Sequence, residues 1–491
     1  MTQWGSSAGP EPSKKAVHPA HGHPGRPLKP SPRRVLLPPM SLLSLGYEAA
    51  MRTLRWVSPL AGRGESKLAR GIRGRLDALE VLEEWARTYR EPERPLAWFH
   101  APSVGEGLQA RISVEALVQE RGDLQLAYTF FSPSALGLAR KMPVHVAGFL
   151  PWDVESELGR LMKVLKPSLV AFTKTEVWPG LTRAAWRRGI PVVLVAATLP
   201  ENAGRLRFPG RTLLGSTFSR LSRVLAVTGE DADRFTRLGV SRDRIQVTGD
   251  PAIDSAWKRA RKLDPEAPWL APFRRAPAPT LVAGSTWGPD EEVLVPALAR
   301  IRQDLPELRA ILAPHEPDEE HLGALERRLR ETGLPSVRLA RVEERGEVGE
   351  EPVVVVDRVG VLARLYTVGT AAYVGGGFHR HGLHSVLEPA AAGLPSAFGP
   401  RFANSWAAGE LIRVGGARSV EGADELARVL LQWFSGGEAL REASERASAY
   451  IEGHRGAAAR TAGALLSLMP GGDDRSPAAN GGSDEREKGE E

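Results

Sequence analysis

The chain has 491 residues, of which 42% are apolar and 25% charged, so it is too long for one hydrophobic core and predicts two domains of about 150–200 residues each. It contains no cysteine, which excludes disulfides, thiolate zinc sites and a cysteine nucleophile and fits a reducing compartment. The formal charge of +6 and the pI of about 9.6 favour anionic partners. Because no nucleic-acid-binding motif is present, we expect a nucleotide or an acidic lipid surface as partner and no nucleic acid.

Both ends of the chain are predicted to be unstructured. Residues 1–39 are rich in proline, glycine, histidine and basic residues and have little apolar surface to bury. They also lack the continuous apolar core of a secretory signal, and Met40 is an alternative start. The tail 471–491 is polar and rich in glycine, so it is expected to be disordered as well.

The first amphipathic segment is "MSLLSLGYEAAMRTLRWVSPL", residues 40–60. Charged residues interrupt it, so it does not form the run of about 20 apolar residues that spans a bilayer. Four apolar residues share one face at helical spacing: Leu43, Tyr47, Met51 and Leu54. The pattern predicts a helix near 41–57 that lies in a membrane interface. An amphipathic helix packed on its own domain stays an equal alternative.

Short apolar runs then alternate with helical patterns, as in repeated βαβ units. The strands predicted in the first series are 96–101, 124–131, 168–173, 190–198 and 223–229. A run with five prolines interrupts the pattern, and we expect a linker over residues 263–280. The strands predicted in the second series are 281–285, 308–314, 353–356, 371–376 and 394–398.

The fold class predicted from this alternation is α/β, with two Rossmann-like domains that face a central cleft. The first domain is expected over residues 40–262 and the second over 281–470. A final helical region, about 437–467, is a candidate to cross back onto the first domain. In such sheets, ligands bind beyond the carboxyl ends of the strands.

Polar residues follow several of these strands. Glu106, in "HAPSVGEG", lies at a strand-to-helix turn where a carboxylate could act as a general base, or could simply favour the positive end of the next helix. Other polar residues at strand ends are Lys174 and Glu176 in "FTKTEVWPG", Ser285 and Thr286 in "VAGSTWGPDEE", and His315 in "LAPHEP". Each could be an ordinary cap, but their repetition on both sides of one cleft predicts a functional site.

The segment 375–388, "GGGFHRHGLHSVLE", follows a predicted strand and precedes a helix expected to begin near Ser385. Glycines let a ligand approach the backbone, and a helix N-terminus is a suitable seat for phosphate. Alternatively, "SVLE" is a capping box in which Glu388 reaches back to Ser385. The loop histidines lack the spacing of metal ligands, so we expect no metal: His379, His381 and His384.

Taken in order, the motifs resemble those of the 3-deoxy-D-manno-octulosonic acid (Kdo) transferases of lipopolysaccharide synthesis. The resemblance covers roughly residues 96–420 and is carried by "HAPSVGEG", "TFFSPS", "TEVWP", "GSTWGPDEE", "APHEP", "DRVGVLARLY" and "YVGGGF…GLHSVLEPAAAGLP". It implies a GT-B glycosyltransferase that moves Kdo from CMP-Kdo to a lipid A precursor with inversion. It also implies a reaction without metal or cofactor, and peripheral or monotopic attachment to the cytoplasmic side of the inner membrane.

The same resemblance implies roles for individual residues. Glu106 matches the family's general base, and Lys174 and Glu176 fall at catalytic positions. A carboxylate at the position of Glu388 commonly binds ribose hydroxyls in GT-B enzymes. The CMP-Kdo site is expected to include Ser285, Thr286, Pro314, His315, Val359, Gly360, Val361, Gly376, Gly377, Ser385, Val386, Leu387 and Glu388.

The sequence departs from the family pattern at three positions. Lys174 replaces a glutamate, Ala252 replaces a basic residue in the segment "GDPAID", and Ser385 replaces a frequent asparagine. The first two family positions are associated with transition-state stabilisation, so Lys174 could supply the cation that position 252 lacks. Two alternatives stay open: another GT-B enzyme acting on a nucleotide sugar, and a catalytically impaired membrane-associated binding protein.

Overall fold

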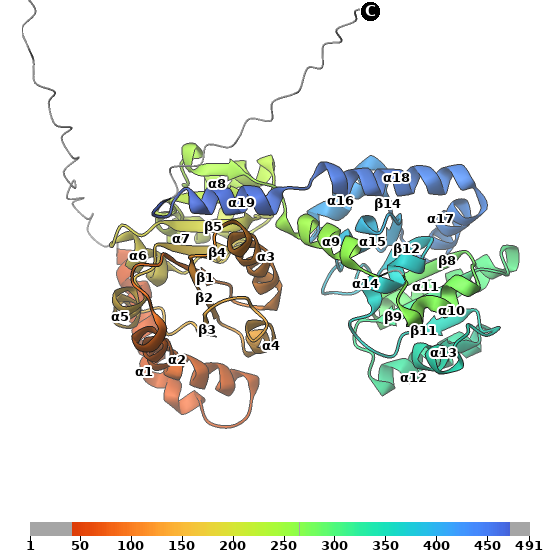
Figure 1. The fold of residues 1–491 in the computed structure, drawn as a ribbon, viewed down its shortest axis with the longest axis horizontal. Coiled ribbons are helices and arrows are strands. Elements are labelled where there is room, and N and C mark those ends of the chain that lie inside the picture. Colours follow the sequence, from red (N-terminus) through yellow and green to blue (C-terminus); the bar gives the residue numbers. More distant parts are fainter. Residues whose placement is uncertain (1–41, 265, 472–491) are drawn as a thin grey trace, which may run out of the picture. The chain divides into compact units, whose positions relative to one another are not determined.

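The structure is a computed structural model that describes residues 42–264 and 266–471. The predictions for residues 1–39, for the start at Met40 and for the tail beyond residue 471 lie outside the described residues. The described chain forms two parallel sheets with helices packed against them (Figure 1).

The first sheet has seven strands in the order β3-β2-β1-β4-β5-β6-β7, and every pair of neighbours is parallel. Its central strands are mostly apolar because both faces are covered; all five residues of β1 are buried. The strands are β1 Leu96–His100, β2 Gln125–Phe130, β3 Val146–Phe149, β4 Leu169–Thr173, β5 Val192–Ala197, β6 Arg223–Ala226 and β7 Ile245–Val247.

The second sheet repeats this architecture, with seven parallel strands in the order β10-β11-β9-β8-β12-β13-β14. Its strands are β8 Thr280–Thr286, β9 Arg309–Pro314, β10 Ser336–Arg338, β11 Val353–Val355, β12 Ala371–Val374, β13 Ser396–Phe398 and β14 Ala417–Ser419. The prediction of two Rossmann-like sheets is confirmed.

Helices precede and connect the strands of each sheet. Those before β8 are α1 Leu42–Ala61, α2 Lys67–Tyr89, α3 Val104–Glu120, α4 Leu136–Ala139, α5 Glu155–Leu165, α6 Pro179–Trp186, α7 Gly210–Phe218, α8 Gly229–Arg237, α9 Pro251–Lys262 and α10 Ala271–Arg275. Those after β8 are α11 Gly288–Asp304, α12 Glu319–Glu331, α13 Leu339–Arg345, α14 Leu362–Leu365, α15 Leu387–Ala391, α16 Trp406–Val414, α17 Ala423–Ser435, α18 Gly437–Gly453 and α19 Ala457–Leu466.

The proline-rich run that we expected to be a linker has regular structure of its own. It contains a short 3-10 turn and α10, and Leu270 and Phe273 are buried in one core cluster with Val282 and Ile311 of the second sheet. Apolar side chains between the prolines therefore anchor this segment to the second sheet.

The last helix differs from the expected domain boundary at residue 470. α19 contacts α3 and α9, and Ala458, Ala462 and Leu465 belong to the core cluster that contains Ala97 of β1 and Val114 of α3. In Figure 1, α19 lies beside α3, whereas α18 lies beside the helices of the second sheet. The crossing that the sequence suggested for the final helical region is therefore present in α19.

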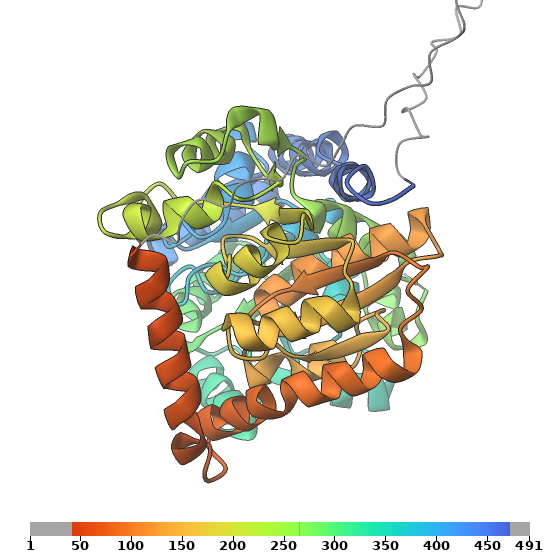
Figure 2. The same ribbon diagram turned by 90° about the vertical axis from the view of Figure 1, so that its left-hand side faces the viewer.

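Helix α1 is amphipathic, but its inward face is polar. Tyr47 donates a hydrogen bond of 2.7 Å to the buried Asp153, Glu48 pairs with the buried Arg183, and Arg55 pairs with Glu157 at 2.6 Å. The predicted membrane face, which included Tyr47, is wrong in this respect. Among residues 45–61 of α1, the exposed large apolar side chains are Leu45, Leu54, Trp56 and Leu60. Figure 2 shows α1 and α2 along the outside of the first half of the chain.

Candidate active site

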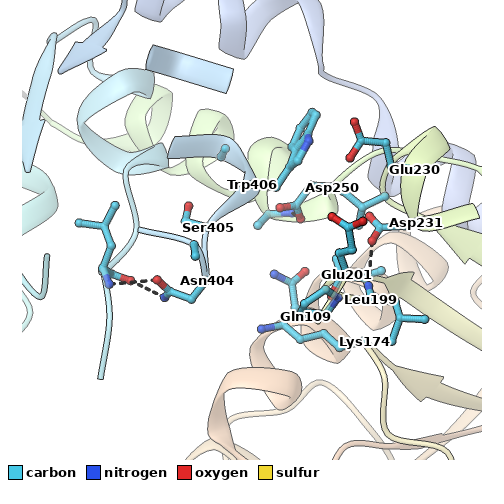
Figure 3. A pocket seen from close by; sticks show the side chains of 18 of the residues that line it. Gln109, Lys174, Leu199, Glu201, Glu230, Asp231, Asp250, Asn404, Ser405 and Trp406 are labelled. Atoms are coloured by element: carbon cyan, nitrogen blue, oxygen red, sulfur yellow. Dashed lines mark hydrogen bonds between the residues drawn. The ribbon is translucent and has the colours of Figure 1, made fainter. Parts of the chain in front are cut away.

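A cavity of about 930 Å³ collects polar groups at the carboxyl ends of strands from both sheets (Figure 3). The residues that follow strands of the first sheet include Gln109, Lys174, Glu201, Arg207 and Asp250. From the second half of the chain the cavity is lined by residues 383–387 and 403–407. Of the predicted site residues, it brings together Lys174, Ser385, Val386 and Leu387.

Lys174 enters the cavity from a strained position. It is the first residue after β4 and has a left-handed backbone, with φ +57°, and Ala196 near the end of β5 has φ +47°. The Lys174 amide donates to the carbonyl of Val195 at 3.0 Å, which ties the two positions together. Non-glycine residues rarely adopt this conformation, and when they do they concentrate at functional sites.

The positions of two family departures share this cavity. Ala252 lines it, and Asp250, two residues earlier, caps α9 by accepting a hydrogen bond of 2.9 Å from the Ala252 amide. Burial raises the pKa of Asp250, while the charge of Lys174 acts in the opposite direction. The charge of Lys174 therefore acts on the segment that contains Asp250 and Ala252.

Glu106 lies on the first turn of α3, directly after the end of β1. Its carboxylate is half-buried and accepts a hydrogen bond from the Ser103 hydroxyl. Glu106 is not among the residues that line the cavity, but Gln109, one helical turn later on the same face, does line it. This places the predicted base beside the cavity.

Glu176, by contrast, forms an ion pair with Arg205 and is not among the cavity-lining residues. The side chain of Glu176 is 38% exposed and that of Arg205 is 31% exposed. Because Glu176 does not line the cavity, it could contribute to the site only through Arg205 or through the loop that the two residues hold.

The glycine run at residues 375–377 is a close backbone crossing. A Cβ on Gly375 would lie 2.1 Å from the Ser285 carbonyl oxygen, and one on Gly377 would lie 2.4 Å from the Gly399 nitrogen. The amide of Gly376 is already engaged, because it donates to Asp290 at 2.8 Å. The Gly376 amide is therefore not free, and these glycines let distant backbone segments meet.

Asp290, on the first turn of α11, organises this crossing and was missed by the sequence analysis. Its two carboxylate oxygens accept hydrogen bonds from the Trp287, Gly376 and Phe378 amides and from the Tyr373 hydroxyl, at 2.8–3.2 Å. The carboxylate is fully buried, and this burial raises its pKa.

The predicted residues after β8 and β9 have different roles. Ser285 has a left-handed backbone, with φ +56°, next to the glycine crossing. Thr286 is fully buried and donates to Glu291 at 2.9 Å, so it supports the loop and cannot reach a ligand. Pro314 is the buried end of β9, and His315 is exposed directly after it.

His315 belongs to a stack of aromatic rings centred on Trp287. The Trp287 ring lies 4.7 Å from His315 and 4.6 Å from His379, and His315 stacks on His384 at 4.4 Å. Trp287 Nε1 donates to His384 Nε2 at 3.0 Å. Burial, followed by the charge of His315, lowers the pKa of His384 to about 4, so this cavity-lining imidazole is neutral at pH 7.

The segment from Ser385 to Glu388 contradicts the predicted capping box. The helix α15 begins at Leu387 and has five residues, with Val386 as its N-cap. Ser385 is exposed to the cavity and accepts a hydrogen bond of 3.3 Å from the Leu387 amide. Glu388 does not reach back to Ser385; it pairs with Arg259 on α9.

The segment from Val359 to Val361 forms the loop before α14. Val359 is 74% exposed, and Gly360 has a left-handed backbone, with φ +87°. None of the three residues is among those that line the cavity.

Asn404 is a further cavity residue that the sequence analysis missed. Its amide group makes two hydrogen bonds with the backbone of Leu383, of 2.8 and 3.1 Å, and so orders the loop that leads to Ser385 (Figure 3). The polar "ANSW" follows the predicted strand 394–398, so the rule that ligands bind at strand ends could have found it.

Within the described ranges, no three His, Asp or Glu side chains gather in a way that could hold a metal ion. The expectation of a reaction without metal stays a prediction.

Comparisons with solved structures show the class of fold. A glycosyltransferase from Rickettsia africae has a TM-score of 0.55 at 11% identity, over 77% of this chain and 99% of that chain. The UDP-GlcNAc 2-epimerase from Neisseria meningitidis has a TM-score of 0.56 at 14% identity, over 76% of this chain and all of that one. With its two parallel Rossmann-like sheets, the chain therefore has the GT-B glycosyltransferase fold.

Sequence comparisons show which family the chain resembles. The family model described as 3-deoxy-D-manno-octulosonic-acid transferase matches residues 79–255. The 3-deoxy-D-manno-octulosonic acid transferase of Bordetella pertussis is 29% identical over 427 residues, which cover 84% of this chain and 97% of that protein. The protein of that name from Haemophilus influenzae is 26% identical over 304 residues, or 61% and 69% of the two chains. This chain is therefore similar to Kdo transferases, through the family model over residues 79–255 and through relatives along most of its length, and this similarity supports a glycosyltransferase.

Proposed function

We propose that this chain transfers Kdo from CMP-Kdo to a lipid A precursor, with inversion and with Glu106 as general base. The observation that carries the proposal is the position of Glu106. Glu106 lies on the first turn of α3, and Gln109 on the next turn lines the cavity. Lys174, whose backbone is left-handed, lines the same cavity. The similarity to Kdo transferases supports the donor and the lipid class of the acceptor.

In the proposed reaction, an acceptor hydroxyl attacks the anomeric carbon of Kdo. Its proton passes to the Glu106 carboxylate while the bond between the anomeric carbon and the CMP phosphate oxygen breaks, and CMP leaves with the electron pair. Charge develops on the leaving phosphate, and preorganised cations or N–H donors stabilise such charge most effectively in a site that excludes water. We propose Lys174 as one of these groups and no metal ion.

We propose that the nucleotide binds on the second half of the chain. Ser385 offers a hydroxyl to the cavity, and His315 and Val359 are exposed. Glu388 would bind the ribose only if it exchanged its partner Arg259 for the sugar hydroxyls. Ser285, Thr286, Pro314, Gly376 and Gly377 would then shape the site rather than contact the nucleotide.

Replacing Lys174 tests its role directly. Lys174→Gln is expected to lower the transfer rate by about 10²-fold, the lower end of what the loss of one preorganised charge-stabilising group costs. Lys166→Gln is a matched control, because Lys166 is exposed and also has a left-handed backbone, with φ +44°. Steady-state rates that fall equally in both variants would show that backbone strain, and not the cavity cation, is what matters.

We propose that the exposed apolar side chains of α1 attach the protein to the cytoplasmic side of the inner membrane. Trp56 is 82% and Leu60 69% exposed, and Leu68, at the start of α2, is 70% exposed. Exposed basic side chains, Arg52 and Arg63, accompany them and would favour anionic lipids. No helix of the described ranges is long and apolar enough to cross a bilayer.

The double variant Trp56→Ser, Leu60→Ser is expected to weaken binding to vesicles with anionic lipid by at least about tenfold, because each side chain contributes roughly 1.5–3 kcal/mol when it is buried. Leu213→Ser with Val247→Ser is the control, since both residues are also exposed but lie on α7 and β7. Sedimentation with vesicles measures the difference. Equal losses in the two double variants would contradict a specific membrane face on α1.

Incubation with CMP-Kdo and a tetra-acylated lipid A precursor, followed by mass spectrometry, tests the proposed function. A second candidate is a binding protein without transferase activity, which the altered residues at positions 174 and 252 favour. It would bind CMP and lipid but give no product. Calorimetry with CMP and UDP separates both from a GT-B enzyme that uses UDP-sugars.

A further inference from the structure

Arg75, on α2, is a buried cation held between aromatic rings. It is 6% exposed, and its guanidinium carbon lies 3.9 Å from the centre of the Phe131 ring, 4.9 Å from that of Trp152 and 5.5 Å from that of Trp178. Burial lowers its pKa to about 10, with Asp153 acting in the opposite direction, so Arg75 stays charged at pH 7. Phe131 is 38% exposed, so the group of aromatic rings around Arg75 reaches the surface.

The guanidinium has donors to spare. Arg75 Nε contacts the Leu150 carbonyl oxygen at 3.4 Å, but neither of its terminal amino groups donates to any described residue. The nearest carboxylates are otherwise engaged. Asp153 accepts from Tyr47 and from the amides of Gly180 and Leu181, so it does not use the planar donor fork of Arg75.

Other polar groups around Arg75 are also without partners. The indole nitrogens of Trp152 and Trp178 and the Nε2 of His100 are buried and have no hydrogen-bond partner among the described residues. Nδ1 of His100 lies 3.0 Å from the Thr129 hydroxyl, which donates to the Phe99 carbonyl at 3.5 Å. Buried polar groups normally find partners, and the two indole groups left over around Arg75 are N–H donors.

This cluster lies next to Glu106, at the carboxyl ends of β1 and β2. The amide of Phe131 donates to the Pro102 carbonyl at 3.2 Å, and Ser103, the next residue, donates to Glu106. On its other side the cluster meets α1, because Asp153 accepts the hydrogen bond from Tyr47. Arg75 is thus placed between the base and the helix with the exposed apolar face.

We infer that Arg75 binds an anionic group of the acceptor, of the phosphate class, while the acceptor hydroxyl lies at Glu106. A guanidinium can bind a phosphate with two parallel N–H bonds, which a lysine cannot reproduce. The inference rests on the proposed function, because it takes the bound molecule to be the acceptor. Arg75 would be a positioning residue, which fixes the acceptor relative to the base.

Transfer rates with two acceptors test this inference. The acceptor glycolipid is used with its phosphates and after phosphatase treatment, with wild type, Arg75→Lys and, as control, Arg87→Lys on an exposed part of the same helix. Arg75→Lys is expected to raise KM for the phosphorylated acceptor by about tenfold or more, with little change in kcat. With the dephosphorylated acceptor, it is expected to match wild type, as Arg87→Lys does with both. Trp178→Phe removes one N–H donor but keeps an aromatic ring, and it should show a smaller loss of the same kind.

Three outcomes would overturn the inference. Equal losses of Arg75→Lys with both acceptors would assign Arg75 a packing role, and weaker CMP binding by calorimetry would assign it to the donor. Calorimetry with inorganic phosphate does not depend on transfer. Equal phosphate affinity of wild type and Arg75→Lys would show that Arg75 does not form an anion-binding site. If the wild type transfers no Kdo but loses phosphate affinity on Arg75→Lys, the anion site stands and the proposed function fails.

Discussion

Glu106→Gln is expected to lower the rate of Kdo transfer by about 10²–10⁴-fold, the typical contribution of general-base catalysis. Glutamine keeps the size of the side chain and can still accept the hydrogen bond from Ser103, but it cannot take a proton from the acceptor hydroxyl. CMP affinity is expected to stay unchanged, because the nucleotide is proposed to bind around Ser385 and His315. Single-turnover rates measure the first effect and calorimetry the second.

Glu115→Gln is the matched control, because Glu115 lies on the same helix and pairs only with the partly exposed Arg111 on its surface. Its transfer rate should equal that of wild type. Near-normal transfer by Glu106→Gln, or a loss of CMP binding, would show that the base lies elsewhere.

Asp290→Asn is expected to cause the largest loss of stability among these variants, about 3 kcal/mol in the free energy of unfolding. Each oxygen of Asp290 accepts from two donors. The amide group of asparagine would place N–H groups opposite one such pair, and each buried donor left without an acceptor costs about 1–3 kcal/mol. Denaturant unfolding, followed by circular dichroism, measures the shift.

Asp304→Asn, at the exposed end of the same helix, is the control and should unfold as wild type does. CMP binding should also weaken in Asp290→Asn, since Asp290 holds the crossing that precedes Ser385. An unchanged unfolding midpoint would mean that the loop does not depend on this carboxylate.

The interior of both sheets could be predicted from the sequence, and their edges could not. All ten predicted strands are present, as β1, β2, β4, β5, β6, β8, β9, β11, β12 and β13. The four missed strands are the four edge strands, β3, β7, β10 and β14. Interior strands are covered on both faces and therefore read as continuous apolar runs. The edge strands have three or four residues and are only partly buried, so they leave no such run.

From the sequence, the site could be predicted only where its residues directly follow a strand. The rule of polar residues after strands identified Lys174 and Ser385, which line the cavity. It misread the glycine run, because what fills the space beside Gly375 and Gly377 is backbone from Ser285 and Gly399. Those neighbours are far away in the sequence, and no local pattern distinguishes a glycine that admits a ligand from one that admits another strand end.

The same limit explains the outcome for α1. Helical periodicity showed an amphipathic segment, but which face turns inward depends on partners such as Asp153 and Arg183, about a hundred residues later in the chain. Tyr47 and Glu48 face inward because they bind the buried Asp153 and Arg183, and Trp56 and Leu60 therefore remain exposed.

The return of α19 to the first sheet has a consequence for how the protein is made. The core around Ala97 and Val114 is completed by Ala458, Ala462 and Leu465, and Asp254 accepts hydrogen bonds of 2.7 and 2.8 Å from the amides of Gly456 and Ala458 at the start of that helix. Domains usually fold as they leave the ribosome, in order from the N-terminus. Here the first sheet has to wait, with an open apolar groove beside α3, until α19 has been translated. The helix that carries Glu106 is thus fully packed only after α19 has been made, and a chain that stops before α19 would expose this groove to chaperones and proteases.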